Sequence, residues 1–413
     1  MLHQFTFKNF KSFKDEMTLD LLASSIKEHP EDVVKDAFEE QVLKVAAIYG
    51  ANASGKSNVI EAFNSMKHMI LYSFREDLSN IKFRPEPYWF EEENIPTEFS
   101  VLFSIESEIF QYGFSVDRNG TILEEYLYQR DTSRVMEHYL KIFDRNKGGI
   151  EGSLLDNIEA TNLLSLVEND TLILSVISKL KVPVIASVYE WFRNVPVVDY
   201  GNPNREFMEI RRMRGGAISH PLIKLIEDPN EKKQLEAFIR AIDIGITNFD
   251  VVEDVDGKRV VAYHQNPFTK ELLQTSIDSE SSGTIKMLML YVNIKKVLDD
   301  GGTIFIDELD AKLHPLLIRY IIIMFHDKRQ NPKDAQLIFS TQEVFTLDKD
   351  NLRRDEIWFT DKNEMGISTL YSLVDYVDDQ DKKVRNDASY GKDYILGRYK
   401  SIPSLKRMEE LDG

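Results

Sequence analysis

The strongest constraint on the fold is a glycine-rich segment near the start of the chain, Gly50-Ala51-Asn52-Ala53-Ser54-Gly55-Lys56-Ser57. It fits the pattern G-x-x-x-x-G-K-[ST], which marks a phosphate-binding P-loop when it lies between a buried strand and a helix. Residues 42–49 before it are mostly apolar and include β-branched side chains, and residues 58–68 after it have a helical pattern. The sequence therefore predicts a P-loop in its usual structural context.

This P-loop predicts a site for ATP and Mg²⁺. Its small residues let backbone N–H groups point at phosphate oxygens, and the following helix adds its positive N-terminal end. Lys56 would hold the β and γ phosphates during catalysis, and the Ser57 hydroxyl would bind Mg²⁺. The other residues expected to line the nucleotide are Gly50, Asn52, Ala53, Ser54 and Gly55.

A second motif is the apolar run Ile304-Phe305-Ile306 followed by Asp307 and Glu308. Together with a P-loop, it indicates a strand that ends in two catalytic acids. Asp307 would serve the Mg²⁺ ion, and Glu308 would orient and polarise the attacking water in phosphoryl transfer. The alternative is that both acids simply cap the end of a strand.

A third motif precedes the acidic strand, where Ser279-Glu280-Ser281-Ser282-Gly283-Thr284 opens a predicted helix. Hydroxyls and a glycine at a helix N-terminus can bind an anion, but they also form an ordinary N-cap. Only the position between the P-loop and the acidic strand favours the anion site.

The order of these three motifs, with Leu309 to Pro315 after the acids, resembles the ABC-type ATPase heads of RecF and SMC proteins. The resemblance implies an α/β fold, in which a mixed sheet with flanking helices carries an antiparallel β subdomain and an inserted helical region. It also implies that two heads enclose ATP, each P-loop facing the partner's signature helix. Ser281, Ser282 and Gly283 stand at that signature, and Asp310 stands at the D-loop.

One subgroup is similar at both ends of the chain. Residues 7–16, the P-loop, residues 307–315, residues 352–359 and the tail at 397–403 look like RloA/AbiL-type ATPases. This resemblance implies a role in bacterial abortive infection and anti-phage defence. It adds Lys11, Ser12 and Asn58 to the expected nucleotide contacts.

The chain departs from these heads at the switch position. Phe339-Ser340-Thr341 is followed by Gln342, where such heads commonly have a histidine. Glutamine can donate a hydrogen bond to the γ phosphate but carries no charge, so we expect slow hydrolysis with Gln342 in the catalytic role. The Q-loop glutamine is ambiguous, because Gln111 and Gln129 are both candidates and either could be a solvated strand residue.

Hydrophobic periodicity suggests three parts along the chain. Residues 1–149 would form an N-terminal ATPase lobe with antiparallel strands at 2–22 and 99–129, and an acidic, helix-prone stretch at 26–41. Residues 150–245 would form a mostly helical insertion that serves as a partner or sensor region. Residues 246–413 would form a C-terminal ATPase lobe with a hairpin at 249–264, the signature helix and the acidic strand.

Composition limits the chemistry and the partners of the 413 residues. The absence of cysteine excludes thiol catalysis, and the net charge of −18 argues against coating nucleic acid through bulk electrostatics. No signal peptide or membrane span is evident, so we expect a soluble cytoplasmic protein. The basic cluster Arg211, Arg212 and Arg214 can be a solvated face or a phosphate contact.

The leading hypothesis is an ATPase that forms a homodimer or larger oligomer and controls an effector protein, a nuclease or toxin, on another chain. The first alternative is a RecF-like ATPase that clamps DNA. The second is an AAA+ ring, for which Arg353 or Arg354 would be the arginine finger. Arg259 and His264 match the spacing of HEPN ribonucleases, but on a strand they do not share one face. His314 is equally compatible with a functional role and with capping backbone groups.

Overall fold

The computed structural model describes residues 1–413 except 37, 75–84, 91–93, 132–137, 166, 181, 203–207, 209–219, 242–244, 256 and 403–413. The basic cluster at 211–214 lies outside the described residues. The described helices include none that is long and apolar enough to cross a membrane.

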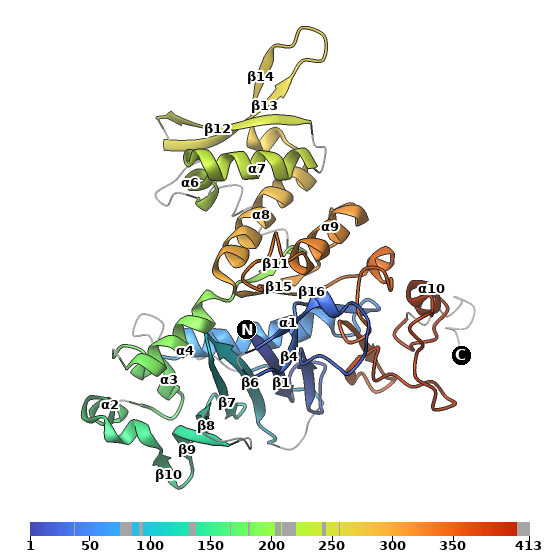
Figure 1. Ribbon diagram of the computed structural model, residues 1–413. Helices are drawn as coiled ribbons and strands as arrows, with labels where there is room; N and C mark the ends of the chain where they lie inside the picture. The colour runs from blue at the N-terminus through green and yellow to red at the C-terminus, as the bar shows by residue number, and fades with distance from the viewer. Residues whose placement is uncertain are drawn as a thin grey trace.

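A six-stranded sheet forms the centre of the molecule, in the order β11-β15-β16-β5-β17-β18 (Figure 1). Neighbouring strands are parallel except for the last pair, which is antiparallel. Its strands are β11 (Val197–Asp199), β15 (Thr303–Asp307), β16 (Gln336–Ser340), β5 (Val45–Gly50), β17 (Ile357–Lys362) and β18 (Ser368–Ser372). β5, β15 and β16 are buried throughout, which explains their continuous apolar sequence.

Helices cover both faces of this sheet. On one face, α1 (Lys56–Tyr72) packs against it, and the rings of Phe63 and Phe305 stack with centroids 4.1 Å apart. On the other face lie α8 (Ser282–Asp300) and α9 (Pro315–His326), in one core with Ile304 and Ile306. The predicted helices after the P-loop and before the acidic strand are thus confirmed.

A seven-stranded antiparallel sheet packs in the same core as α1, in the order β10-β9-β8-β7-β6-β1-β2. Its first hairpin pairs Phe5 with Leu19, and the turn at Asn119-Gly120 joins two neighbouring strands, as predicted. The strands are β1 (Leu2–Lys8), β2 (Met17–Asp20), β6 (Thr97–Ile105), β7 (Glu108–Val116), β8 (Ile122–Arg130), β9 (Tyr139–Asn146) and β10 (Gly149–Glu151). With the central sheet, it gives the mixed α/β fold with an antiparallel part that the sequence predicted.

Residues 150–245 contribute to two different regions. The helices α2 (Ile158–Leu164), α3 (Ile173–Ile177) and α4 (Pro183–Asn194) belong to the core around α1, and β11 then joins the central sheet. The upper lobe in Figure 1 combines α6 (Pro221–Glu227) and α7 (Pro229–Ala241) with β12 (Ile246–Asp254), β13 (Gly257–Gln265) and β14 (Leu272–Ser276). Strand β11 separates these two sets of helices in the sequence, and the predicted 249–264 hairpin is confirmed as β12 and β13.

The helix-prone stretch at 26–41 is not an α-helix. It contains one 3₁₀ turn, η1 (Pro30–Asp32), followed by β3 (Val33–Lys35), which pairs with β4 (Gln41–Leu43) as a two-stranded ribbon. Val33 and Val34 favour extended structure. Asp32 is buried among charged partners from distant elements, and these contacts outweigh the local helix propensity.

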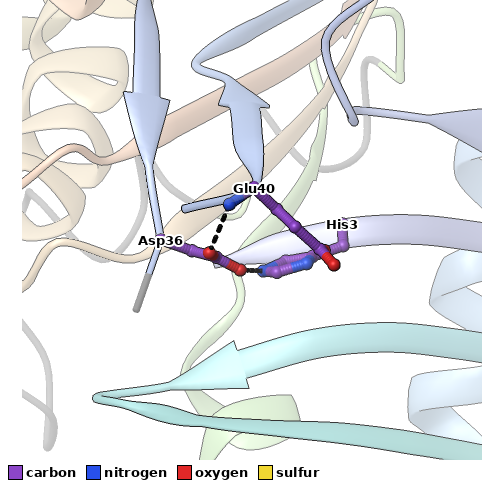
Figure 2. A group of neighbouring side chains, drawn as sticks. All are labelled: His3, Asp36 and Glu40. Atoms are coloured by element: carbon purple, nitrogen blue, oxygen red, sulfur yellow. Dashed lines mark hydrogen bonds and ion pairs between the residues drawn. The ribbon is translucent and has the colours of Figure 1, made fainter. Parts of the chain in front are cut away.

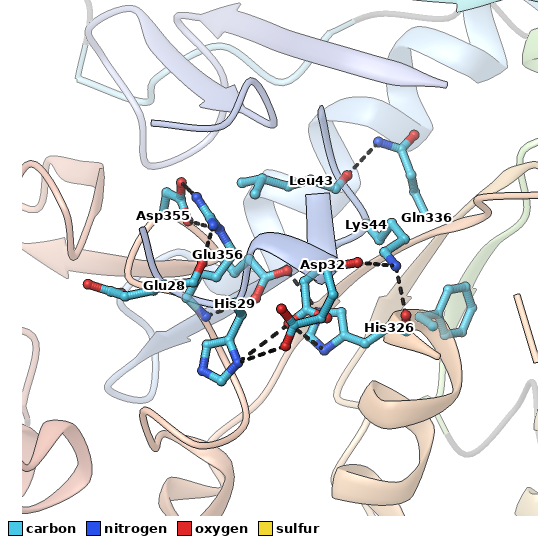
Figure 3. Close-up of polar contacts among 12 residues, drawn as sticks. Glu28, His29, Asp32, Leu43, Lys44, His326, Gln336, Asp355 and Glu356 are labelled. Atoms are coloured by element: carbon cyan, nitrogen blue, oxygen red, sulfur yellow. Dashed lines mark hydrogen bonds and ion pairs between the residues drawn. The ribbon is translucent and has the colours of Figure 1, made fainter. Parts of the chain in front are cut away.

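The partners of Asp32 form a buried charge cluster, shown in Figure 3. His326 Nε2 lies 2.9 Å from Glu356 Oε1, and His326 Nδ1 lies 3.5 Å from Asp32 Oδ2. Lys44 Nζ donates a hydrogen bond of 2.7 Å to the His326 carbonyl. Burial disfavours a charged imidazole, but the charge and hydrogen bond of Glu356, with the charge of Asp32, outweigh it and raise the pKa of His326. The cluster thus ties the β3–β4 ribbon to the end of α9.

The raised pKa of His326 predicts a pH-dependent contribution to stability. This stabilisation is fully present below the unfolded-state pKa, about 6.5, and is lost as pH rises through the higher folded-state pKa. The loss of unfolding free energy in His326→Asn should therefore be larger at about pH 6 than at about pH 9. Urea unfolding of both proteins at the two pH values measures this difference. Equal losses would contradict the prediction.

Candidate functional site

The two glycines of the P-loop occupy positions where no side chain fits. A Cβ atom on Gly50 would lie 2.5 Å from Thr360 Oγ1, and one on Gly55 would lie 2.9 Å from Ser368 Oγ. Gly55 also has a φ of 117° and is the N-cap of α1, where it supplies no side-chain hydrogen bond. The first N–H groups of α1 have no acceptor inside the helix, so an anion can accept from them.

The Lys56 side chain folds back into the loop. Its Nζ donates to the carbonyl oxygens of Gly50 at 2.8 Å and Ala51 at 2.9 Å. Burial lowers the pKa of Lys56, while the charges of Asp310, Asp307 and Glu308 oppose this effect. A phosphate beside the loop would give the buried ammonium a charged acceptor.

The two predicted metal ligands lie together. Asp307 ends β15, and its carboxylate is hydrogen-bonded to the Ser57 and Ser340 hydroxyls. Burial raises the pKa of Asp307, although these two hydrogen bonds lower it. A hydroxyl and a carboxylate offer the oxygen ligands that Mg²⁺ prefers, so this pair fits the ion.

Glu308 occupies a strained position directly after the acidic strand. Its φ is 50°, in the left-handed region, and its N–H donates 2.8 Å to Ser340 Oγ. Burial and the neighbouring charges of Asp307, Asp199 and Asp310 raise the pKa of Glu308. Non-glycine residues held in this conformation cluster at functional sites, which agrees with a catalytic role.

Asp199 and Gly201 were not identified from the sequence, and both face the acids. In the parallel pairing of β11 with β15, Asp199 is the register partner of Asp307. A Cβ atom on Gly201 would lie 2.2 Å from Glu308 Oε2, so the Glu308 carboxylate packs directly over this glycine. The only sequence signal was an acid after the short run Val197-Val198, which is too brief to indicate a strand.

Neither glutamine proposed for the Q-loop lies on the central sheet. Gln111 is on β7 and Gln129 is on β8, and Gln129 Nε2 donates 2.9 Å to Glu108. The structure instead places the acid Asp199 at the end of the strand beside the acidic strand.

Gln342, which follows β16, and Asp310, which follows β15, lie together. The Gln342 N–H donates 3.2 Å to Asp310 Oδ2, and the Gln342 side chain is exposed. The charge of Asp310 acts on both Lys56 and Glu308. These predicted residues therefore share one edge of the sheet with the P-loop.

Lys11 and Ser12, which the sequence predicts as nucleotide contacts, lie beside the first turns of α1. Asn58 Nδ2 donates 2.7 Å to Ser12 Oγ. The Ser368 hydroxyl donates 2.7 Å to the Ser54 carbonyl and lies 2.8 Å from Ser12 Oγ. Lys11 Nζ pairs with Glu61 at 2.5 Å. Ser12 and Asn58 thus brace the loop, and the Lys11 ammonium is already engaged.

The signature residues open α8. Ser281 Oγ accepts a hydrogen bond of 3.1 Å from the Thr284 N–H, so Ser281 is a true N-cap ahead of Ser282 and Gly283. In the part of the chain that the structure describes, no hydrogen bond or ion pair joins Ser281, Ser282 or Gly283 to the P-loop. One turn later, Lys286 Nζ donates to the carbonyls of Glu308 at 3.1 Å and Leu309 at 3.0 Å.

The structure bears on three further interpretations of the sequence. The arginine fingers are wrong, because Arg353 is 1% exposed and bonded to Asp355, and Arg354 is paired with Glu28. His314 is an N-cap, since its Nδ1 accepts 3.2 Å from the Leu316 N–H. The HEPN spacing lies on β13, where His264 pairs with Glu280 at 2.8 Å.

The packing of Glu308 over Gly201 yields a direct test of the site. In Gly201→Ala, the new Cβ should displace the Glu308 carboxylate, because this flexible side chain moves more easily than the backbone. We expect the ATPase rate to fall at least about tenfold with Tm nearly unchanged. Steady-state phosphate release and thermal unfolding measure both. An unchanged rate would show that this position of Glu308 is not needed for hydrolysis.

Two solved structures are similar to this chain over most of its length. The SMC head domain from Thermotoga maritima is similar over 90% of this chain and 98% of its own, with 14% identity and a TM-score of 0.39. The Smc head domain with a coiled coil and joint derived from Pyrococcus yayanosii is similar over 90% and 97%, with 11% identity and a TM-score of 0.38. A search of curated proteins gave no match.

A family model described as "AAA domain, putative AbiEii toxin, Type IV TA system" matches residues 45–348. The matched range begins with β5 and includes the P-loop, the signature helix, the acidic strand and Gln342. Because it covers most of the chain, the protein belongs to this family of P-loop ATPases.

Proposed function

We propose that this protein is an ATP-driven switch, in which two copies close around Mg²⁺-ATP and reopen after hydrolysis. The observation that carries the proposal is the meeting of Lys56, Ser57, Asp307 and Glu308 at one edge of the parallel sheet. In this set, Lys56 can bind phosphate, and Ser57 and Asp307 can bind Mg²⁺. Glu308 is a further carboxylate that is not one of the magnesium ligands.

Each group has a distinct role in the proposal. The N–H groups of the P-loop and Lys56 bind the phosphates, and Ser57 and Asp307 would hold Mg²⁺, which neutralises phosphate charge. Glu308 orients the attacking water beside the γ phosphate. Gln342 donates a hydrogen bond without charge, which supports slow turnover.

The signature helix supports closure between two copies. Ser281 to Gly283 open a long helix and have no bond to the described part of their own P-loop, so they suit the phosphates of a second copy. Lys286 connects this helix to the backbone of Glu308 and Leu309. A shift of α8 on closure would therefore reach the catalytic acid directly.

The output of the switch would be control of an effector protein in anti-phage defence. The toxin–antitoxin system named in the family description supports a defence context of that kind. The helical part of residues 150–245 includes α6 and α7 of the lobe at the top of Figure 1, and this upper lobe could hold such a partner. The contact of α6 with α8 links the upper lobe to the signature residues.

The solution mass of Glu308→Gln tests closure. Removing the catalytic acid should trap the closed state, so light scattering should show a doubled mass only with Mg²⁺ and ATP. The wild type should show a smaller, transient increase. Lys56→Ala in the same background should abolish the doubling, because the nucleotide is no longer held.

A mass that is the same with and without ATP in all three proteins would contradict nucleotide-driven closure. ATP binding measured by calorimetry on the same samples separates this result from simple loss of binding. If Glu308→Gln binds ATP and has the mass of a dimer or larger oligomer both with and without ATP, the site is an ATPase centre in a preassembled complex.

A further inference from the structure

A second group of ligand-type side chains lies far from the P-loop in the fold. His3 is on β1, and Asp36 and Glu40 lie in the turn between β3 and β4 (Figure 2). Each of the three offers one ligand atom, and these atoms lie within 4.8 Å of one another. The neighbouring Leu2 N–H bonds at 2.6 Å to Gln336, the first residue of β16. The group is therefore at the amino ends of the parallel strands, opposite the nucleotide edge.

Asp36 presents a buried carboxylate oxygen toward this group. Its Oδ1 accepts hydrogen bonds from the N–H groups of Phe38 at 2.8 Å and Glu40 at 2.9 Å, which fixes the carboxylate. Its Oδ2 has no hydrogen-bond partner among the described residues, although the side chain is only 3% exposed. This oxygen lies 3.9 Å from His3 Nε2, which is too long for a hydrogen bond. A buried, unpartnered carboxylate oxygen is costly, and a bound cation would remove that cost.

The other two side chains are held around the same point. His3 has no exposed surface, and its Nε2 lies 3.1 Å from Ser104 Oγ. Glu40 Oε1 accepts a 2.6 Å hydrogen bond from Arg130, whose guanidinium stacks over Phe38. Arg130 offsets part of the negative charge but also fixes the orientation of Glu40.

We propose that His3, Asp36 and Glu40 bind one divalent cation of the zinc class at a structural site. Zn²⁺ accepts imidazole nitrogen and carboxylate oxygen together, whereas Mg²⁺ prefers oxygen ligands and water. The ion would cross-link β1 to the β3–β4 ribbon. Because β4 leads directly into β5, the cross-link fixes the start of the strand that carries the P-loop.

Zinc content and thermal unfolding test the proposal in the full chain. All proteins carry Asp307→Asn, so that zinc cannot occupy the predicted magnesium ligands. After equilibration with Zn²⁺ and removal of the unbound ion, the parent should retain one zinc per chain and gain about 3 °C or more in Tm. Asp36→Asn and Glu40→Gln should lose both effects. Glu39→Gln, in the same turn but exposed and paired with Lys35, should behave as the parent.

The Asp36→Asn variant separates a metal site from a purely structural contact. The amide oxygen that this substitution introduces can accept the same two N–H groups, so the turn should persist and Tm without zinc should not fall. Zinc retention by Asp36→Asn, or no zinc in the parent, would overturn the proposal. If the variants fail to fold, Co²⁺ bound to a parent that also carries His326→Asn decides, because Asp32, His326 and Glu356 form another group with the same ligand types. Visible absorption typical of four-coordinate nitrogen and oxygen ligation supports the site, and its absence refutes it.

Discussion

The parallel pairing of β5, β16 and β15 is the constraint on which the candidate site depends. Parallel strands bring their carboxyl ends to one edge, so residues separated by more than 250 positions, Lys56 and Asp307, face each other there. A one-residue slip would turn Asp307 to the opposite face of the sheet and separate it from Ser57. Close packing of particular side chains, such as the stacking of Phe305 on Phe63, fixes the register and thereby also the geometry of the acids.

The opposite edge of the same sheet carries a different kind of polar chemistry. Buried charges of Asp32, Lys44, His326 and Glu356 tie the β3–β4 ribbon to α9, as Figure 3 shows. Breaking a buried charge pair is costly, because it leaves an uncompensated charge in a medium that solvates it poorly. One edge thus carries the proposed nucleotide site, and the buried charges at the other hold the chain before the P-loop in place.

The sequence was sufficient for the parts of the site that are local. The P-loop between a buried strand and a helix, and the acids after an apolar strand, depend on contiguous residues and were predicted correctly in position. Asp199 and Gly201 reach the site only through the pairing of a three-residue strand, β11, and no local pattern reveals such a strand. The predictions for Arg353 and for residues 26–41 were wrong for the same reason. Distant partners determine the conformations of both: Glu28 bonds to Arg353, and His326 pairs with Asp32.

In the proposed switch, Glu308 would connect the static geometry to a motion of the signature helix. Its backbone is strained at a φ of 50°, its N–H is bonded to Ser340, and its carbonyl accepts from Lys286 at the start of α8. The side chain, in contrast, is limited chiefly by contact with Gly201 and by like charges around it. Before nucleotide binds, the Glu308 backbone is thus held in place while nearby acids repel its carboxylate. A Mg²⁺ ion beside Asp307 would add positive charge and relieve this repulsion. The signature helix and the nucleotide would then act on one residue through different atoms, which is the physical requirement for coupling closure to hydrolysis.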